Sequence, residues 1–346
     1  MERNVSKMCS GYLTINKQAL INNLKKLQRL STSETGSVVK ANAYGLGSKE
    51  IVKLLATNGV RKFFVATINE AEIIRETLGK SPEIYVFSGH LEGDTKKFID
   101  LEARPILNSI VQLNRHHSQS RELPFAIQID TGMNRLGVTS NDWVKELATG
   151  ADFIMSHLAC ADEPSNLENK KQLNKFLQMT SDLNIPRSLS ATAGILLGDN
   201  YHFDLTRPGI GLYGGFPFSD SEHVVSLDIP VIQTKVINKG ESIGYGASFI
   251  AKKKMTIATI SAGYADGIIR SLSKKAIFYH EGIPCRVVGR ISMDLITVDI
   301  SKLENEPNYL NFIGPSQSID QVAEISNTIG HEILTSLGNR YSRIYK

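Results

Sequence analysis

One lysine stands where its amine could act as a nucleophile. Lys40 follows the apolar run SVV at residues 37–39 and precedes ANAYG at residues 41–45. If the run is a buried strand, it delivers Lys40 to the strand end, where burial lowers the amine's pKa and lets it attack an aldehyde. Taken alone, an ordinary surface lysine is the simpler interpretation, so the chemical one depends on what other strands bring to the same place.

Two further apolar runs end in groups that could meet Lys40. The run 125–129 leads into DTGMNRLG, which carries Arg135, and the run 153–156 leads into His157. A guanidinium binds a phenolate or carboxylate through paired hydrogen bonds. Arg135 could instead pair with Asp130, and a lone histidine is often only a satisfied core group.

Two glycine-containing segments could bind phosphate. They are SATAG at residues 190–194 and RPGIG at residues 207–211. Small residues let backbone N–H groups approach an anion closely, and the Thr192 hydroxyl adds a donor. Each glycine could separately serve a tight turn, but their joint placement favours phosphate.

The elements that must position these residues alternate regularly up to about residue 215. Short runs rich in β-branched residues alternate with amphipathic helical patterns, which is typical of repeated βα units. Eight parallel strands predict a closed (β/α)8 barrel, whose reactive groups lie at the carboxyl ends of the strands and whose phosphate site follows strands seven and eight. The expected strands are 37–40, 62–66, 84–87, 103–107, 125–129, 153–156, 187–190 and 210–213, with helices at 17–30, 49–57, 68–78 and 168–183.

The pattern changes after Gly215 to β-type runs. We expect strands at 227–237, 255–260, 275–279, 285–288 and 295–300 and a helical tail at 319–337. The fold class predicted is α/β, with an N-terminal (β/α)8 TIM barrel at 1–225 followed by a C-terminal mainly β domain at 226–346. The first ~11 residues could pack with the β domain.

Composition excludes some other classes. A net charge of +4 from 39 basic and 35 acidic residues is too small to indicate nucleic-acid binding, and we interpret the run Lys252–Lys254 as a solvated strand edge. No apolar run reaches the ~18 residues that a membrane helix needs. Cys9, Cys160 and Cys285 have no metal-type spacing and fit a reducing cytoplasm. We predict no bound metal and no membrane partner.

Seven segments together resemble alanine racemase, a family of fold-type III pyridoxal phosphate enzymes. The segments are VVKANAYGLG, IDTGMNRLGV, SHLACADEP, RPGIGLYGG, GYGASF, SAGYADG and GRISMDL, and they span nearly the whole chain in order. The first is highly specific for the cofactor lysine. GYGASF and GRISMD separate the racemase from relatives that have only the barrel.

The resemblance implies a two-base mechanism. Pyridoxal 5'-phosphate would form a Schiff base with Lys40, which would also be the base on one face of the substrate. Tyr245 of the partner subunit would be the base on the other face, so a homodimer is implied. Each base must exchange a proton near neutral pH. The reaction would interconvert L-alanine and D-alanine and supply D-alanine for peptidoglycan.

The resemblance also assigns the supporting residues. Arg207 would face the pyridine nitrogen and disfavour its protonation, which restricts side reactions. His157 would orient Tyr245 and link it to Arg207. The remaining assignments are Tyr44, Thr192, Gly209 and Ile210 around the phosphate, Arg135 at O3′ and the substrate carboxylate, Met293 as a backbone donor to that carboxylate, and Tyr264 with Asp294 at the narrowed entrance.

Three positions depart from the family pattern. Gln128 replaces a lysine that is often carbamylated, so we predict no carbamate and an amide that could hold Arg135 instead. Ala191 replaces an asparagine that normally precedes the residue whose hydroxyl binds the phosphate, which is Thr192 here. Asn339 aligns roughly with a phosphate-binding tyrosine, for which Tyr341 lies close enough to substitute.

Other functions remain open at this point. A broad-specificity amino acid racemase would use the same two bases with a wider entrance. A noncatalytic pyridoxal phosphate carrier would share the barrel and the lysine but lacks a second domain. Basic amino acid decarboxylases pair the pyridine nitrogen with a carboxylate, which Arg207 argues against.

Overall fold

The computed structural model describes residues 10–346, which form two compact units. One unit contains residues 20–221, and the other joins residues 10–19 to residues 222–346. Each unit has its own sheet and its own buried core, and each is described by itself below.

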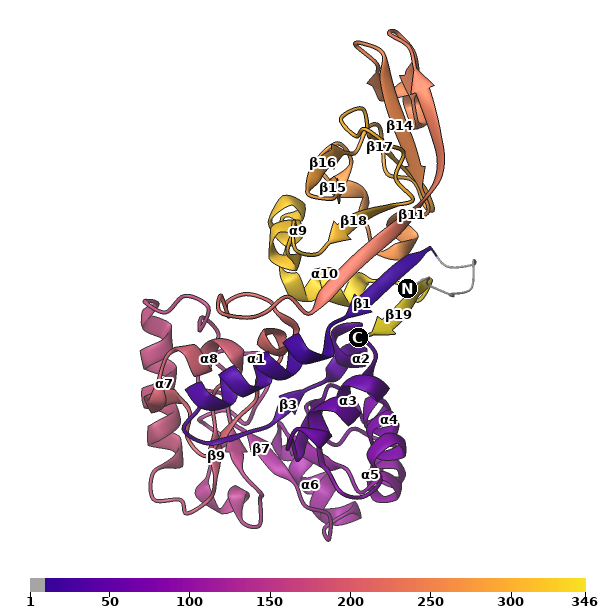
Figure 1. Cartoon of the computed structure of the whole chain (residues 1–346). Helices are drawn as coiled ribbons and strands as arrows, with labels where there is room; N and C mark the ends of the chain where they lie inside the picture. Colours follow the sequence, from indigo (N-terminus) through magenta and orange to yellow (C-terminus); the bar gives the residue numbers. More distant parts are fainter. Residues whose placement is uncertain (1–9) are drawn as a thin grey trace. The chain divides into compact units, whose positions relative to one another are not determined.

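The first unit is built around seven parallel strands (Figure 1). The strands neighbour one another in sequence order, as parallel βα units do. Their side chains are almost all buried, which explains why apolar runs marked them in the sequence. They are β3 (Ser37–Val38), β4 (Lys62–Val65), β5 (Glu83–Val86), β6 (Arg104–Leu107), β7 (Ala126–Gln128), β8 (Ile154–Met155) and β9 (Arg187–Ser188).

The eighth strand, β10 (Leu205–Thr206), closes the ring. It pairs in parallel with β2 (Glu34–Thr35), and the N–H of Gly36 continues the ladder to the carbonyl of Thr206 at 2.9 Å. On its other side the N–H of Arg207 donates to the carbonyl of Ser190 at 2.8 Å. The barrel class predicted from the sequence is confirmed.

The predicted position of the eighth strand was wrong. Residues Ile210–Tyr213 form a short 3-10 helix, η3, which begins after three residues that follow β10. All four are buried, so their apolar run resembled a strand, whereas β10 itself is only two residues long and lies next to Arg207 and Pro208. The first predicted strand was also too long, because Lys40 lies two residues beyond β3.

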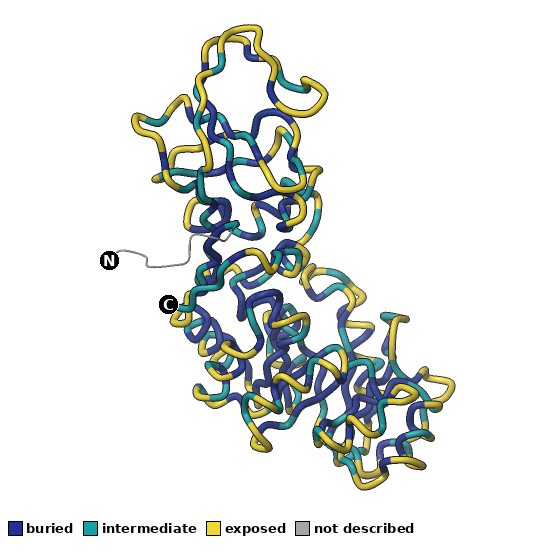
Figure 2. The backbone as a smooth tube through the Cα atoms, turned by 90° about the vertical axis from the view of Figure 1, so that its right-hand side faces the viewer, coloured by how far each residue is buried: buried dark blue, intermediate teal, exposed yellow. Residues whose placement is uncertain are grey.

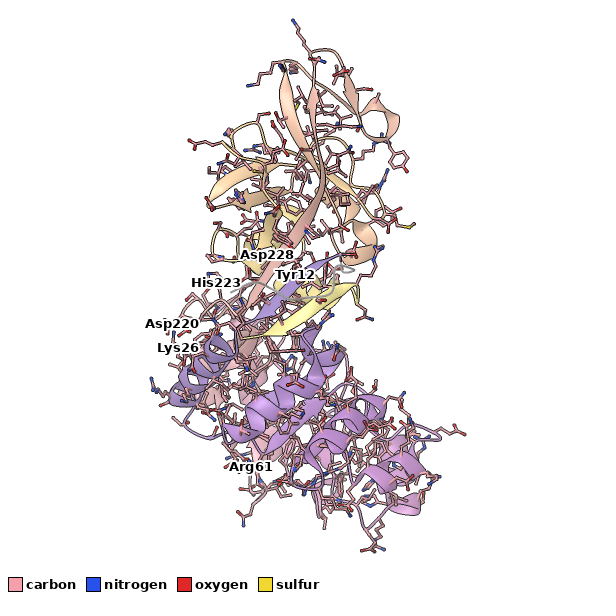
Figure 3. The ribbon with its side chains drawn as sticks, turned by 45° about the vertical axis from the view of Figure 1, so that its right-hand side comes forward. Tyr12, Lys26, Arg61, Asp220, His223 and Asp228 are labelled. Atoms are coloured by element: carbon pink, nitrogen blue, oxygen red, sulfur yellow. The ribbon has the colours of Figure 1, made fainter. Side chains whose placement is uncertain are left out.

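Helices surround the barrel strands (Figure 1). In Figure 2 the buried residues lie along the middle of this unit and the exposed residues at its periphery. Lys26 of α1 forms an ion pair with Asp220 at 3.5 Å, which ties that helix to the segment after η3 (Figure 3). The helices are α1 (Lys17–Leu30), α2 (Lys40–Tyr44), α3 (Ser48–Thr57), α4 (Ile68–Leu78), α5 (Thr95–Leu101), α6 (Ile110–Gln119), α7 (Leu167–Thr180) and α8 (Thr192–Leu196).

The second unit is mainly β, as predicted. Its longest strand, β11 (Val225–Ile237), pairs with β1 (Gly11–Ile15), with β14 (Met255–Ile260) and with β18 (Tyr309–Ile313). Tyr12 of β1 lies opposite Asp228 of β11, and both are marked in Figure 3. The other strands are β12 (Ser242–Ile243), β13 (Phe249–Ile250), β15 (Ile277–His280), β16 (Ile283–Arg286), β17 (Ile296–Asp299) and β19 (Tyr341–Tyr345).

The predicted helical tail is two short helices followed by a strand. Helix α9 (Ile319–Ser326) begins at a capping box made by Ser318 and Gln321 and ends where Asn327 turns into the left-handed region. Helix α10 (Gly330–Ser336) follows, and β19 then pairs in parallel with β1.

Three smaller features complete the description. The run Lys252–Lys254 is exposed, but it lies in the turn between β13 and β14 rather than along a strand edge. Cys160 and Cys285 are free thiols, and Cys9 lies outside the described residues. Over residues 10–346, no helix combines the length and apolarity that a membrane crossing requires.

Candidate active site

Lys40 is presented by an unusual backbone turn. The four residues after it all have φ between 52° and 56°, in the left-handed region. Non-glycine residues there cost about 1–2 kcal/mol each, so other contacts must hold the turn. Glu70 of α4 supplies two of them: its Oε1 accepts from the N–H of Ala41 at 2.8 Å, and its Oε2 accepts from the N–H of Ala66 at 2.7 Å.

The surroundings of Lys40 favour a neutral amine. Its Nζ lies 5.9 Å from the centre of the Phe87 ring, and its side chain is half-buried. Burial lowers the pKa of Lys40, the positive charge of Arg135 lowers it further, and Glu70 acts in the opposite direction. The amine is therefore closer to being a nucleophile or a base than an exposed lysine would be.

Thr192, Gly209 and Tyr44 lie together, as predicted. The Thr192 hydroxyl oxygen accepts from the N–H groups of Gly209 at 3.1 Å and Gly211 at 3.2 Å, which leaves its own proton available to donate. A Cβ added to Gly209 would lie 2.3 Å from the Tyr44 hydroxyl, and one added to Gly211 would lie 2.5 Å from Cγ2 of Thr192. Only glycine fits at these two positions.

The Tyr44 phenol completes this group of donors. Its ring centre lies 4.7 Å from that of Tyr213, whose hydroxyl donates to the carbonyl of Val38 at 3.0 Å. Burial raises the pKa of Tyr44, so the phenol keeps its proton and can act as a donor. Ile210 is buried at the start of η3 beside Gly209. The four residues predicted to surround a phosphate therefore come from three segments, two of which contact Gly209: α2 through Tyr44 and α8 through Thr192.

Arg207 is almost completely buried, with 1% of its surface exposed. Its Nη2 donates to the carbonyl of Ser156 at 2.9 Å, and its Nη1 donates to the hydroxyl of Ser188. Burial lowers the pKa of Arg207. These described partners are uncharged, so they fix the direction of the guanidinium without neutralising its charge.

His157 is surrounded by positive charge. Burial, followed by the charges of Arg207, Arg135 and Lys40, lowers the pKa of His157 to about 3. Its carbonyl accepts from Nε2 of Gln172 at 2.9 Å. The imidazole is therefore neutral at physiological pH. Because each of these groups affects the same histidine, the structure brings the four predicted polar residues of the barrel mouth together.

The loop that carries Arg135 is held by its own backbone contacts. Oδ1 of Asp130 accepts from the N–H groups of Gly132 at 2.9 Å and Asn134 at 3.1 Å, so Asp130 caps the loop rather than pairing with Arg135. Nε2 of Gln128 donates to the carbonyl of Leu136 in the same loop at 3.1 Å, and the suggestion that its amide holds the guanidinium stays a prediction. Arg135 itself is exposed.

The second unit carries the other predicted residues. Tyr245 stands in the short helix η4 (Tyr245–Ala247) with 72% of its surface exposed. Tyr264, in η5 (Tyr264–Asp266), lies beside the Met293 loop, because the N–H of Ala265 donates to the carbonyl of Met293 at 3.1 Å. Asp294 accepts from Nη1 of Arg340 at 2.7 Å.

The two residues noted near the C-terminus differ in exposure. Tyr341 is buried in β19, and burial together with the nearby Asp266 raises the pKa of its phenol. Asn339 is exposed. The role suggested for Tyr341 at a phosphate stays a prediction.

Several supporting residues were missed from the sequence. They are Glu70, Gln172, Ser188 and Arg340, which contact the predicted residues or their backbone. Each lies in an ordinary helix, strand or loop pattern, and no local motif distinguishes it. Throughout the described part of the chain, no three histidine, cysteine or acidic side chains gather closely enough to hold a metal ion.

A parallel eight-stranded barrel with these groups at its strand ends, followed by a mainly β unit, defines a class of two-domain barrel enzymes. The family model for the N-terminal domain of alanine racemase matches residues 15–217, and the model for its C-terminal domain matches residues 224–345. The chain belongs to the alanine racemase family and is an enzyme of that family.

Individual relatives agree with this assignment. Alanine racemase of Dinoroseobacter shibae is 49% identical over 98% of this chain and 99% of its own length. The catabolic alanine racemase of Agrobacterium fabrum is 41% identical over 97% of this chain and 92% of its own length. The structure of alanine racemase from Bartonella henselae with covalently bound pyridoxal phosphate is 36% identical, covers 97% of this chain and 99% of its own, and has a TM-score of 0.92.

Proposed function

We propose that this enzyme interconverts L-alanine and D-alanine with pyridoxal 5'-phosphate held by Lys40. The observation that carries the proposal is the half-buried Lys40, whose lowered pKa is set among Arg135, His157 and Arg207 at the barrel mouth. The Bartonella henselae relative has the same fold and carries covalently bound pyridoxal phosphate.

The residues present fit this cofactor. Gly209 and Gly211 have no side chains that would block an approach to the donors Thr192 and Tyr44, whereas a Cβ at either position would collide with one of them. Ile210 lies at the same place, so these residues would hold the phosphate. Arg207 would face the ring nitrogen, and Arg135 would bind O3′ and the substrate carboxylate. When bound, the cofactor supplies an electron sink that makes the α-proton of the amino acid acidic.

The protein's own groups move the proton. Lys40 accepts the α-proton at Nζ on one face, and the phenol of Tyr245 of the partner subunit donates its proton on the other face. In the reverse direction the two groups exchange roles. Burial and Arg135 support the first part, since they lower the pKa of Lys40. Arg207 keeps a positive charge that disfavours protonation of the ring nitrogen, and His157, which is neutral, orients Tyr245.

A homodimer follows from the role of Tyr245. Its side chain is 72% exposed in the single chain, and Ile232, Val236 and Ile250 of the same unit are 56–58% exposed. A contiguous apolar patch marks an interaction surface, and we propose that the homodimer covers these side chains. Met293 would offer its backbone to the substrate carboxylate, and Tyr264 with Asp294 would narrow the entrance.

We further propose a cytoplasmic enzyme that supplies D-alanine for peptidoglycan. Relatives have names of both kinds, catabolic in Agrobacterium fabrum and biosynthetic in Pseudomonas aeruginosa. Complementation of a bacterium that requires D-alanine tests this role. Growth without added D-alanine supports it, and continued dependence argues against it.

Racemisation of L-alanine, L-serine and L-lysine by the purified enzyme tests the reaction. We expect alanine to be preferred, Lys40→Ala to be inactive, and Tyr245→Phe to lose at least a hundredfold in kcat while still binding the cofactor. Equal rates on all three substrates would indicate a broad-specificity racemase. Cofactor binding without racemisation would indicate a carrier, and a fully active monomer would exclude the shared site.

A further inference from the structure

Two loops of the second unit lie backbone to backbone. The N–H of Tyr264 donates to the carbonyl of Ser292 at 3.1 Å, and the N–H of Ala265 donates to the carbonyl of Met293 at 3.1 Å. A Cβ on Gly263 would lie 2.2 Å from the Met293 carbonyl oxygen. The backbones of the two loops are therefore in direct contact, and neither loop can move without disturbing the other.

Arg340 connects both loops through its guanidinium. Its Nε and Nη2 donate to the two carboxylate oxygens of Asp266, at 2.7 and 2.8 Å, and its Nη1 donates to Asp294 at 2.7 Å. Asp266 is completely buried, whereas the Asp294 side chain is 54% exposed. A planar guanidinium can serve two carboxylates in fixed directions, which a lysine ammonium cannot do.

Asp266 connects Arg340 to the loop that carries Tyr264 by hydrogen bonds to the backbone. Its Oδ2 accepts from the N–H of Gly263 at 2.9 Å, and its carbonyl accepts from the N–H of Gly338 at 3.2 Å. On the far side, Gly267 has φ of +92°, and a Cβ there would lie 2.2 Å from the carbonyl oxygen of Ser336. The loop is therefore fixed between residues 292–294 and residues 336–340.

We propose that Arg340 and Asp266 are positioning residues for the substrate carboxylate. They do not touch the substrate; they set the separation between the Tyr264 loop and the backbone of Met293. The inference rests on the proposed function, which places Tyr264 and Met293 at the substrate. Because displacements of about 1 Å in a binding group can change rates a hundredfold, loosening this contact should be measurable.

The first experiment follows backbone hydrogen exchange in the cofactor-free protein and does not depend on activity. In Arg340→Met we expect amides of residues 263–267 and 292–295 to exchange at least tenfold faster. Peptides from β11 and β14 should exchange as in the wild type. Arg286→Met, which changes an exposed arginine of the same unit, is the matched control and should leave both loops unchanged.

The second experiment separates KM from kcat for L-alanine. We expect Arg340→Met to raise KM at least tenfold while kcat falls less than threefold, and Arg340→Lys to lie between Met and wild type. Asp294→Asn should raise KM by a smaller factor and add little to Arg340→Met, because both changes break one contact. Arg286→Met should show wild-type kinetics.

The outcomes distinguish this inference from the proposed function. A wild-type enzyme that does not racemise alanine defeats the proposed function, whereas an active wild type with unchanged KM in Arg340→Met defeats this inference alone. Faster exchange with unchanged KM would make Arg340 merely structural and would also overturn it. If Arg340→Met does not fold, Arg340→Lys and Asp294→Asn decide. The lysine keeps a positive charge beside the carboxylates, and Asp294→Asn keeps the contact between Arg340 and Asp266.

Discussion

The Tyr44 hydroxyl occupies the space that a side chain on Gly209 would need. A Cβ on Gly209 would lie 2.3 Å from that oxygen and 3.2 Å from the ring carbon that bears it. We therefore expect Gly209→Ala to push the phenol away from the Thr192 hydroxyl. Overpacking of this kind costs about 1–3 kcal/mol. Thermal unfolding should show the loss, and titration with pyridoxal 5'-phosphate followed by absorbance should show at least tenfold weaker binding.

A double variant tests the cause. Tyr44→Phe removes the oxygen that the new methyl group would meet, so the double variant Tyr44→Phe with Gly209→Ala should be less destabilised than the two single changes summed. Residues in contact usually show such coupling. If the two effects add without coupling, the close approach to Tyr44 does not explain why glycine is needed here.

The ammonium group of Lys40 should lose its proton at a lower pH than that of an ordinary lysine. Burial and Arg135 lower its pKa from 10.5, so the neutral fraction at pH 8 is larger than for an unshifted lysine. In the cofactor-free protein, trace acetylation followed by mass spectrometry should show Lys40 labelling with a midpoint below 10.5. The exposed Lys253 in the same digest provides an internal reference for reagent reactivity.

The signs of two substitutions follow from the same charges. Arg135→Gln removes a cation, so the midpoint for Lys40 should rise. Glu70→Gln removes an anion, so the midpoint should fall. A midpoint that does not respond to Arg135 would mean that the two side chains do not interact in solution.

Much of the barrel could be predicted because its strands are buried and therefore consist mainly of apolar residues. Strands such as β4 and β5 are covered on both faces and consist of short apolar runs, and the residues that follow β7 and β8 carry Arg135 and His157. Strand β10 gave no such signal, because it is two residues long and lies beside charge and proline. The apolar run of η3 gave the same signal without being a strand.

Contacts between distant parts of the chain account for the rest. Strands β1 and β19 pair across almost the whole sequence, and neither has a partner that local pattern could reveal. The same holds in the site. Ser188 supports Arg207, and Arg340 joins two loops, but each acts through a contact that only the folded chain creates.

Ser188 provides a test of how Arg207 is oriented. Its hydroxyl accepts from Nη1 of Arg207 in a fully buried place, so Ser188→Ala leaves a charged donor without that acceptor. Such a loss costs about 1–3 kcal/mol. We expect reduced stability and an altered absorption spectrum of the bound cofactor. Ser190→Ala is the matched control, since Ser190 is equally buried and its hydroxyl bonds instead to the carbonyl of Tyr201. If the bound cofactor has the same absorption spectrum in Ser188→Ala as in Ser190→Ala, the role of Ser188 is contradicted.

Arg104 should stabilise the amino end of the barrel. Its Nη1 donates to Glu83 at 2.9 Å, to Asp152 at 3.0 Å and to the Tyr85 hydroxyl at 3.0 Å, and its side chain is 25% exposed. Removing one partner of a buried ion pair costs 3–5 kcal/mol, and partial exposure reduces this, so we expect Arg104→Met to lose about 1–3 kcal/mol in urea unfolding. Lys96→Met, which breaks the exposed pair with Asp100, should lose less than about 0.5 kcal/mol.

The loss in Arg104→Met should depend on pH. Burial already raises the pKa of Asp152, and Arg104 opposes that rise, so its removal raises the pKa further. A carboxyl group whose pKa is higher in the folded than in the unfolded protein stabilises the fold when it is protonated. The variant should therefore be closest to the wild type at low pH and should lose stability relative to it as pH rises through the folded pKa of Asp152. Urea unfolding at pH 5 and pH 8 measures this difference, and an equal loss at both values would show that Asp152 is not the group left unpaired.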